Sequence, residues 1–224
     1  MKIALITLAR KNSKRIKNKN YKLFAGYPLI GYTLGIMEGM SYDSYLFTDY
    51  DDIKKYTKKN HPSINIIHME SKYAQDKHIL MESIQYMHKK INADLYVLLQ
   101  PTSPIRFLPI IMNAIDFMVN NEEMKSGFSV YQLPKKYYWL KDPVNFDQNE
   151  RDGNGCEKQE LYVENGSFYI FRKQILEDNE KHVIVKPYCQ FVDKFIFDID
   201  TEEEWNQAER YYEILKYKHN EGKL

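Results

Sequence analysis

Two groups of charged side chains, far apart in the sequence, have types and spacings suited to phosphate chemistry. Six of the eleven residues from Arg10 to Asn20 are lysine or arginine, and no carboxylate precedes Glu38. Near the other end, Asp198 and Asp200 are separated by a single apolar residue. Preorganised cations stabilise phosphate oxygens, and paired carboxylates are oxygen ligands of the kind that Mg²⁺ prefers. The sequence therefore predicts a site for a phosphorylated substrate and a metal ion.

The basic loop, Arg10 to Asn20, follows an apolar run, Ile3 to Ile6, which predicts a strand buried on both faces. The loop then leaves the carboxyl edge of a sheet, where α/β proteins bind anions. A solvated surface loop is the alternative. G-x-x-x-x-G-K-[ST] is absent and the G-x-G at Gly153 to Gly155 follows no strand, so side-chain cations must hold most of the phosphate charge.

The two aspartates lie in a segment, Phe195 to Thr201, whose alternation predicts a strand with both carboxylates on one face. Such carboxylates repel each other unless a cation lies between them. In the alternative interpretation Asp200 caps the last helix, but Thr201 and Glu204 have the spacing of a capping box without it.

Two amide side chains are further candidates for ligand binding. Gln100 follows the buried strand Ala93 to Leu99, and its carboxamide could pair with a base edge or a sugar hydroxyl. Asn165 precedes Gly166, where the backbone could approach a ligand closely or form a bulge between two halves of a strand.

Composition limits the remaining possibilities. A chain of 224 residues is predicted to form a single α/β domain over residues 1–224. The formal net charge of +1 argues against nucleic acid as a partner. Cys156 and Cys189 are expected to be free thiols in a reducing compartment. No apolar stretch of membrane-spanning length and no signal-peptide pattern is present, so we expect a cytoplasmic protein with no membrane partner.

Strand and helix patterns alternate, which predicts a Rossmann-like, mainly parallel sheet flanked by helices. Asp49 or Asp51 is expected to cap the second helix. After the first strand, the expected strands cover residues 44–47, 64–67, 93–99 and 126–130, and the expected helices begin at Pro28 and cover residues 53–59, about 79–91, 105–118 and 205–215.

The stretch from residue 131 to 160 lacks clear periodicity and is rich in aromatic, proline, glycine and charged residues. A long irregular segment inside a domain calls for a structural reason. The aromatic cluster Tyr137 to Trp139 suits the core of an interface, which predicts an extension used for dimerisation. A lid or a self-packed loop is the alternative.

Four motifs resemble those of the acylneuraminate cytidylyltransferases and their relatives that make CMP-pseudaminic and CMP-legionaminic acids. The first, A-R-x-x-S-K-x-I-x-x-K-N, matches Ala9 to Asn20, with Arg15 as in the pseudaminate branch. The others are L-L-Q-P-T-S-P-I-R at Leu98 to Arg106, N-G-S-F-Y-I at Asn165 to Ile170, and D-I-D-T at Asp198 to Thr201.

The resemblance implies a homodimeric transferase that moves CMP from CTP to the anomeric hydroxyl of an acidic nine-carbon sugar. It implies Mg²⁺, with Mn²⁺ as an alternative, on Asp198 and Asp200. The implied catalytic residues are Arg10, Lys19 and Asp200; the implied nucleotide ligands are Ala9, Arg10, Ser13, Lys14, Lys19, Asn20, Asp76 and Gln100; the implied sugar ligands are Gln100, Thr102, Ser103 and Asn165.

The sequence departs from the family pattern at one position that bears on the base. Met69-Glu70 stands where relatives carry an arginine–proline pair that acts near the base. Two alternatives therefore stay open: a related nucleotidyltransferase with another base or acceptor, and a non-catalytic nucleotide-binding protein.

Overall fold

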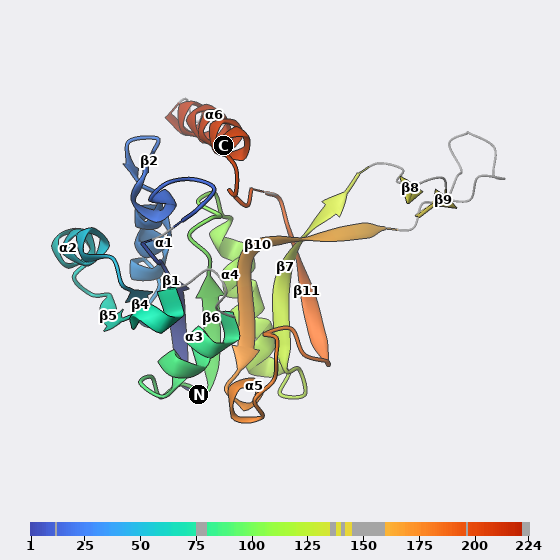
Figure 1. Cartoon of the computed structure of the whole chain (residues 1–224). Helices are drawn as coiled ribbons and strands as arrows, with labels where there is room; N and C mark the ends of the chain where they lie inside the picture. The colour runs from blue at the N-terminus through green and yellow to red at the C-terminus, as the bar shows by residue number, and fades with distance from the viewer. Residues whose placement is uncertain are drawn as a thin grey trace.

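The computed structural model describes residues 1–11, 13–74, 80–134, 138–139, 142–144, 160–195 and 197–220. It contains a seven-stranded sheet in the order β11-β7-β10-β6-β1-β4-β5 (Figure 1). In this sheet β10 runs antiparallel to β6 and β7, and the other neighbouring pairs are parallel, which confirms the mainly parallel α/β fold. The strands are β1 (Ile3–Leu8), β4 (Asp43–Thr48), β5 (Asn65–His68), β6 (Leu95–Leu99), β7 (Ser126–Leu133), β10 (Leu161–Arg172) and β11 (Tyr188–Asp193).

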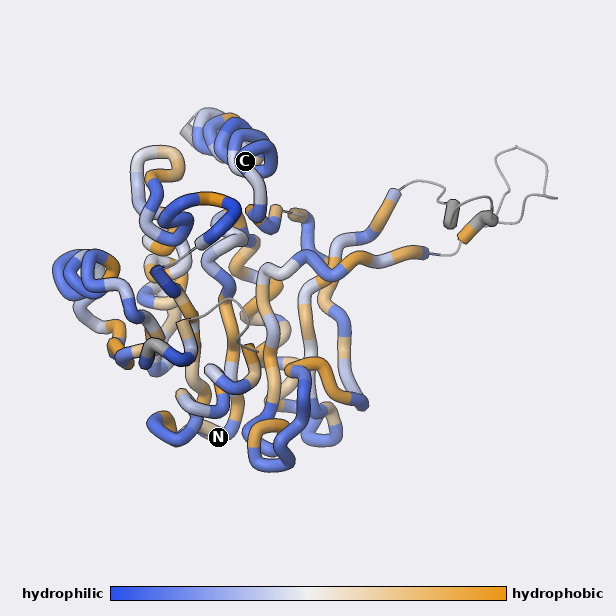
Figure 2. Tube along the Cα trace, viewed as in Figure 1, coloured by the Kyte–Doolittle hydropathy of each residue, from blue (hydrophilic) through white to orange (hydrophobic). Residues whose placement is uncertain are grey.

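Helices cover both faces of the sheet because β1 and β6 are apolar on both sides. Ala4 and Ile6 pack with residues of α3 (Leu80–His88) and α5 (Gln174–Glu177) on one face. Leu5 packs on the other face with α1 (Leu29–Glu38), α2 (Asp51–Asn60) and α4 (Leu108–Asn120). Figure 2 shows the apolar residues following these central strands. No helix among the described residues is long and apolar enough to cross a membrane.

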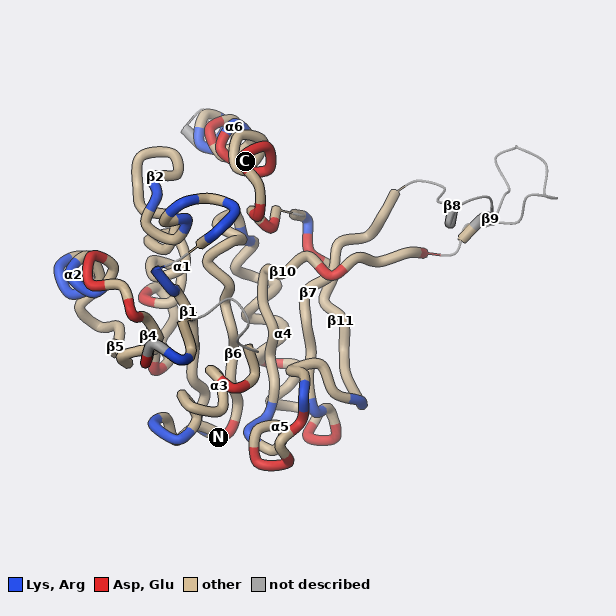
Figure 3. Tube along the Cα trace, in the orientation of Figure 1, with Lys and Arg blue, Asp and Glu red and all other residues tan. Residues whose placement is uncertain are grey.

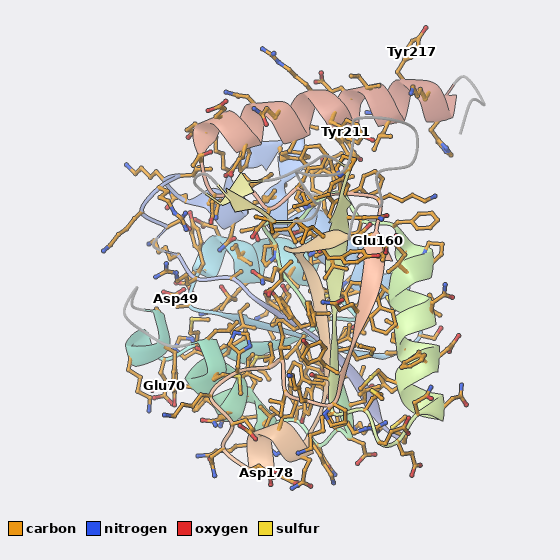
Figure 4. The ribbon with its side chains drawn as sticks, turned by 90° about the vertical axis from the view of Figure 1, so that its right-hand side faces the viewer. Asp49, Glu70, Glu160, Asp178, Tyr211 and Tyr217 are labelled. Atoms are coloured by element: carbon orange, nitrogen blue, oxygen red, sulfur yellow. The ribbon has the colours of Figure 1, made fainter. Side chains whose placement is uncertain are left out.

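The last helix, α6 (Glu202–Asn220), closes over the start of the chain. Trp205 packs against Phe24, whose ring lies 5.6 Å away in the hairpin of β2 (Leu23–Phe24) and β3 (Tyr27–Pro28). The predicted capping box is present, since Glu204 N donates to Thr201 Oγ1 at 3.2 Å and Glu204 Oε2 accepts from Thr201 N at 2.8 Å. Figure 4 shows α6 crossing the end of the sheet, with Tyr217 pointing away from the protein.

Strands β7 and β10 continue past the sheet as a two-stranded arm, in which residues 130–133 pair with residues 161–164. The pairing register shifts between Glu164 and Tyr169, and within this bend Gly166 has φ of +68°, where glycine is favoured. The short strands β8 (Tyr138–Trp139) and β9 (Asp142–Pro143) lie beyond the arm (Figure 1). The prediction of an irregular stretch from residue 131 is therefore wrong for its first residues, which extend β7.

The predicted strand over Phe195 to Thr201 is absent from the described part of that segment. The edge of the sheet beside β7 belongs instead to β11, which the sequence patterns do not indicate. After β11, the carboxylate of Asp193 accepts hydrogen bonds from the backbone N–H groups of Lys194 and Phe195, and this turn directs the chain away from the sheet. The segment is held to the exit of β6 through Ile199 N, which donates to Thr102 O at 2.8 Å.

Two helix starts also differ from the predictions. Neither Asp49 nor Asp51 caps α2, because Asp49 Oδ1 accepts from Lys11 N at 2.8 Å and Asp51 pairs with Lys54 in the first turn. Helix α4 begins at Leu108 instead of residue 105.

Arg106 joins three elements from a partly buried position. Its Nε donates to Ser167 O of β10 at 3.0 Å, its Nη1 donates to Thr33 Oγ1 of α1 at 3.0 Å, and its Nη2 donates to Gln100 O. Burial lowers the pKa of Arg106, while the charges of Asp193 and Asp198 act in the opposite direction. The planar guanidinium therefore ties together β10, α1 and the exit of β6.

We predict that Arg106→Lys lowers the free energy of unfolding by about 3 kcal/mol, because an ammonium donates from a single atom and cannot reach three acceptors that lie on different elements, so carbonyls are left without donors. Urea unfolding followed by circular dichroism measures this loss. The exposed Arg210 provides the control, Arg210→Lys, which should leave stability unchanged. Equal stability of the two variants would contradict the structural role of Arg106.

Candidate functional site

A cavity of about 520 Å³ lies at the carboxyl ends of β1 and β6. Its walls come from the basic loop, the exit of β6, the segment after β5, helix α3 and the segment that precedes α6. The lining residues are Leu8, Arg10, Ser13, Lys14, Arg15, Ile16, Lys19, Asn20, Met69, Tyr73, Leu80, Ser83, Gln100, Pro101, Thr102 and Asp200.

Backbone bonds and one buried anchor hold the basic loop in place. Ile16 is fully buried against the cluster beneath α6. Asn18 has a left-handed φ of 55°, and its carbonyl accepts from the N–H groups of Tyr21 and Lys22. The Asn20 side chain donates to Arg10 O at 3.0 Å. The loop is therefore folded back on itself, and Figure 3 shows its basic residues gathered above β1.

Arg10 extends across the cavity from this loop. Its Nη1 lies 3.5 Å from Ala74 O, in the short 3₁₀ helix η2 (Ser71–Ala74) that follows β5. The side chain thus spans the two walls of the cavity and leaves a guanidinium at its lining.

Asp200 meets two cations of the basic loop. Its Oδ1 lies 2.9 Å from Lys19 Nζ, and its Oδ2 lies 2.9 Å from an Nη atom of Arg15. Lys19 Nζ also donates to Ile199 O at 2.7 Å, and only 12% of its side chain is exposed. The repulsion expected between the two carboxylates is therefore relieved at Asp200 by cations of the chain itself.

Asp198 lies under different constraints. Loss of hydration raises the pKa of Asp198, and the charge of Asp200 adds to the rise, whereas Thr102 and Lys19 lower it. The residue is exposed to solvent on one side, while the other side abuts β10. A Cβ atom on Gly166 would lie 2.9 Å from Asp198 Oδ2, so glycine is required there for space as well as for its φ.

Eight of the predicted site residues line the cavity: Arg10, Ser13, Lys14, Lys19, Asn20, Gln100, Thr102 and Asp200. Four others do not. Ala9 is buried in the core with its N–H bonded to Phe47 O, Ser103 and Asn165 are buried, and Asp198 lies outside the lining. Asp76 falls outside the described residues, as do Asn12, Tyr137, Cys156 and the G-x-G segment at residues 153–155.

Asn165 is occupied by structural bonds. Its Nδ2 donates to Phe195 O at 2.7 Å and to Asp193 Oδ2 at 3.3 Å, and its Oδ1 accepts from Ser167 N at 3.2 Å. These bonds fix the bend of β10 against the turn after β11. The bulge interpretation of this motif is therefore the one that the contacts favour.

Several lining residues do not follow from the sequence patterns. The motifs give Arg15 no role, although it pairs with Asp200. Ser83 is a buried hydroxyl among the apolar positions of α3, and a polar residue on an apolar face is a usable signal. Tyr73 packs against Tyr86 at 4.8 Å and against Phe47 at 6.1 Å, and no local pattern marks it.

The lining divides by chemistry into two parts. One part is cationic, with Arg10, Lys14, Arg15 and Lys19, and the other includes apolar groups from Leu8, Met69, Tyr73 and Leu80. An anionic ligand with a flat, weakly polar moiety matches this division, because phosphates need cations and a base needs apolar contact. A nucleotide has this composition.

Comparison with known proteins agrees with the geometry. Two curated relatives match most of the chain: the N-acylneuraminate cytidylyltransferase of Oncorhynchus mykiss, 28% identical over 93% of this chain, and the CMP-N,N'-diacetyllegionaminic acid synthase of Legionella pneumophila, 27% identical over 96% of it. The chain spans 50% of the length of the first and 97% of the second.

Solved structures share the fold at low identity. A CMP:2-keto-3-deoxy-manno-octonic acid synthetase complexed with CTP superposes with a TM-score of 0.70 at 12% identity, covering 95% of this chain and 98% of that one. The 4-diphosphocytidyl-2C-methyl-D-erythritol synthase of Anaerococcus prevotii gives 0.66 at 13% identity, covering 95% and 96%. The sequence pattern of the cytidylyltransferases matches residues 4–221, and the chain therefore belongs to the cytidylyltransferase family.

Proposed function

We propose that the protein transfers CMP from CTP to the anomeric hydroxyl of a nonulosonic acid and releases pyrophosphate. The observation that carries the proposal is the meeting of Lys19 with Asp200 at a cation-lined cavity, since the two residues belong to separate motifs 181 positions apart. The names of the relatives from O. mykiss and L. pneumophila support a sialic-acid-like acceptor.

In the proposed reaction the sugar oxygen attacks the α-phosphorus, the new O–P bond forms, and the bond to the pyrophosphate oxygen breaks. This step needs alignment and neutralisation of charge more than a covalent intermediate. Arg10, Lys14 and Lys19 would neutralise the triphosphate. Loss of hydration on the side that abuts β10 raises the pKa of Asp198, so this carboxylate would accept the proton of the sugar hydroxyl.

We also propose that Mg²⁺ acts in this site. A metal held mainly by protein would need more ligands than are gathered here, because no group of three His, Cys, Asp or Glu forms a metal site among the described residues. Mg²⁺ often takes one or two carboxylates together with substrate phosphates and water. Asp198 and Asp200 suit that arrangement, in which the ion arrives with the nucleotide and adds positive charge at the phosphates.

A homodimer through the arm is part of the proposal. The arm exposes Val163, and Val144 is exposed beyond β9, so apolar surface projects from the sheet. The free thiol of Cys189 is consistent with a reducing compartment such as the cytoplasm.

The direct test incubates the purified protein with Mg²⁺, each of the four nucleoside triphosphates and a panel of nonulosonic acids, and measures pyrophosphate. We expect turnover with CTP and at least one acidic sugar. Met69 is buried at the cavity wall, at the position where relatives carry arginine. We therefore expect this protein to reject UTP less strongly than a relative whose base pocket contains that arginine. Preference for GTP or ATP would show that the base pocket differs from that of the family.

The two aspartates should respond differently to amide substitution. Asp198→Asn should abolish turnover and should keep or raise the melting temperature at neutral pH. The pKa of Asp198 is raised in the folded state, so the charged carboxylate lowers stability at pH values above the unfolded-state pKa. This loss of stability disappears as the pH falls. Asp200→Asn should also abolish turnover but lower stability by about 1–2 kcal/mol, since Lys19 loses its partner in a largely buried position. Thermal melts measure the stability of the two variants, and assays at saturating substrate measure their turnover. Equal shifts in melting temperature would contradict the pairing of Asp200 with Lys19.

Sedimentation velocity at micromolar concentration tests the dimer. We expect a dimer that Val163→Lys converts to a monomer, because a charge placed on an apolar contact surface must be desolvated to associate. The control is Val119→Lys on the exposed surface of α4, far from the arm. A monomer with full activity in the wild-type protein would refute this part of the proposal.

A further inference from the structure

We infer that Arg15 is an exchangeable counter-ion of Asp200: it pairs with Asp200 Oδ2, yields that oxygen to a divalent cation, and then binds the triphosphate. The inference rests on the proposed function, because it concerns the same metal and nucleotide site. It assigns a role to a cation of the basic loop that the motifs leave without one, and it couples two ligands through one side chain.

The two oxygens of Asp200 are paired with different cations. Lys19 Nζ lies 2.9 Å from Oδ1, and Nη2 of Arg15 lies 2.9 Å from Oδ2. A divalent cation bound to Asp200 uses at least one of these oxygens, and positive charges that share one oxygen repel each other. Metal binding at Asp200 therefore requires that one of the two side-chain cations moves away.

The contacts of the two cations show which of them gives way. Lys19 Nζ also donates to Ile199 O at 2.7 Å, and only 12% of its side chain is exposed, so release from Asp200 would leave a largely buried ammonium with one bond fewer. The Arg15 side chain is 66% exposed, and exposed ion pairs contribute little to stability. Arg15 is therefore the partner that exchanges.

Arg15 can change partners without movement of the backbone. The next residue, Ile16, is 1% exposed and packs in the cluster beneath α6, and backbone bonds to Asn18 O close the loop that follows. From this fixed point the long side chain of Arg15 lines the cavity. Since a guanidinium binds carboxylate and phosphate oxygens with the same pairs of donors, rotation of the side chain is enough to move its charge from Asp200 to a phosphate.

The exchange makes the binding of metal and triphosphate cooperative. When Asp200 Oδ2 passes to the metal, the Arg15 guanidinium loses its carboxylate partner and joins Arg10 and Lys14, which line the same cavity, in binding the triphosphate. A triphosphate that engages Arg15 frees Asp200 Oδ2 for the metal in the same way. Each ligand thus raises the affinity for the other by the same factor, as linkage requires.

The first test measures metal binding without nucleotide and without turnover. Mn²⁺ takes the same oxygen ligands as Mg²⁺, and electron paramagnetic resonance measures its free and bound fractions. Arg15→Gln removes the competing cation, so Mn²⁺ should bind about three- to fivefold more tightly, whereas Asp200→Asn should abolish the binding. Unchanged or weaker Mn²⁺ binding in Arg15→Gln, or unchanged binding in Asp200→Asn, would overturn the inference.

Lys17 provides a matched control in the same loop. Its side chain is exposed and lies outside the cavity lining. Lys17→Gln removes the same charge without freeing Asp200, so at about 0.15 M ionic strength the Mn²⁺ affinity should change by less than about twofold. An equal gain in Lys17→Gln and Arg15→Gln would show that the net charge of the loop controls the metal, and it would overturn the role of the Arg15–Asp200 pair.

The second test measures CTP affinity by isothermal titration calorimetry with and without Mn²⁺. Arg15→Gln should weaken CTP binding about tenfold when Mn²⁺ is present, because the guanidinium then binds phosphate in the wild-type protein. Without Mn²⁺ the loss should be less than about twofold, because Arg15 must first leave Asp200. Equal losses under the two conditions would show that Arg15 acts as a fixed charge and would contradict the exchange.

These binding measurements separate the inference from the proposed function. A wild-type protein with the Arg15-dependent coupling, but without turnover of CTP and any nonulosonic acid, would contradict the proposed transfer reaction alone. Turnover by a wild-type protein whose Mn²⁺ affinity does not depend on Arg15 would contradict this inference alone.

Discussion

The set of hydrogen bonds made by the Arg106 guanidinium is the interaction on which the arrangement of the site depends. A planar group with five donors can bind acceptors in several directions at once, and Arg106 uses this to join β10, α1 and the exit of β6. One of its acceptors is the carbonyl of Gln100, whose side chain lines the cavity. The position of that lining residue is therefore fixed by a charged side chain that does not itself line the cavity.

Charge balance organises the other side of the cavity. The basic loop contains no carboxylate of its own, and Asp200 provides one from the opposite end of the chain. Lys19 is held by both Asp200 and Ile199 O, while Arg10 and Lys14 bring further positive charge to the lining. Repulsion among neighbouring cations is thus relieved in part, and the loop still presents positive charge to the cavity.

Much of this could be predicted from sequence, for identifiable reasons. The strands β1 and β6 are apolar on both faces, and a short run of that kind is typical of a strand at the centre of a parallel sheet. The capping box at Thr201 is a local signal and is confirmed. The motif residues of the basic loop do gather at one cavity, since a loop at a strand end has little freedom to lie elsewhere.

The misses have physical causes too. Strand β11 is an edge strand with alternately exposed and half-buried residues, so its apolar content is too low to mark it. The segment at Asp198 alternates as a strand does, but alternation shows only that a chain is extended, and here Ile199 bonds to Thr102 O and Lys19 Nζ instead of to a neighbouring strand. Asn165 matches a motif, yet only the folded chain shows that its amide is bonded to Phe195 and Asp193.

The closure of α6 over the β2–β3 hairpin has a consequence for biosynthesis. Translation delivers the N-terminal region first, and β1, β4, β5 and β6 can pair as soon as residues up to Leu99 have emerged. The residues that cover Phe24 and Ile16 and neutralise the basic loop emerge only after the last strand of the sheet, and they are Ile199, Asp200 and Trp205. A nascent chain that still lacks these residues thus carries an open apolar cluster beside uncompensated cations, and their arrival both buries that surface and completes the ligand cavity.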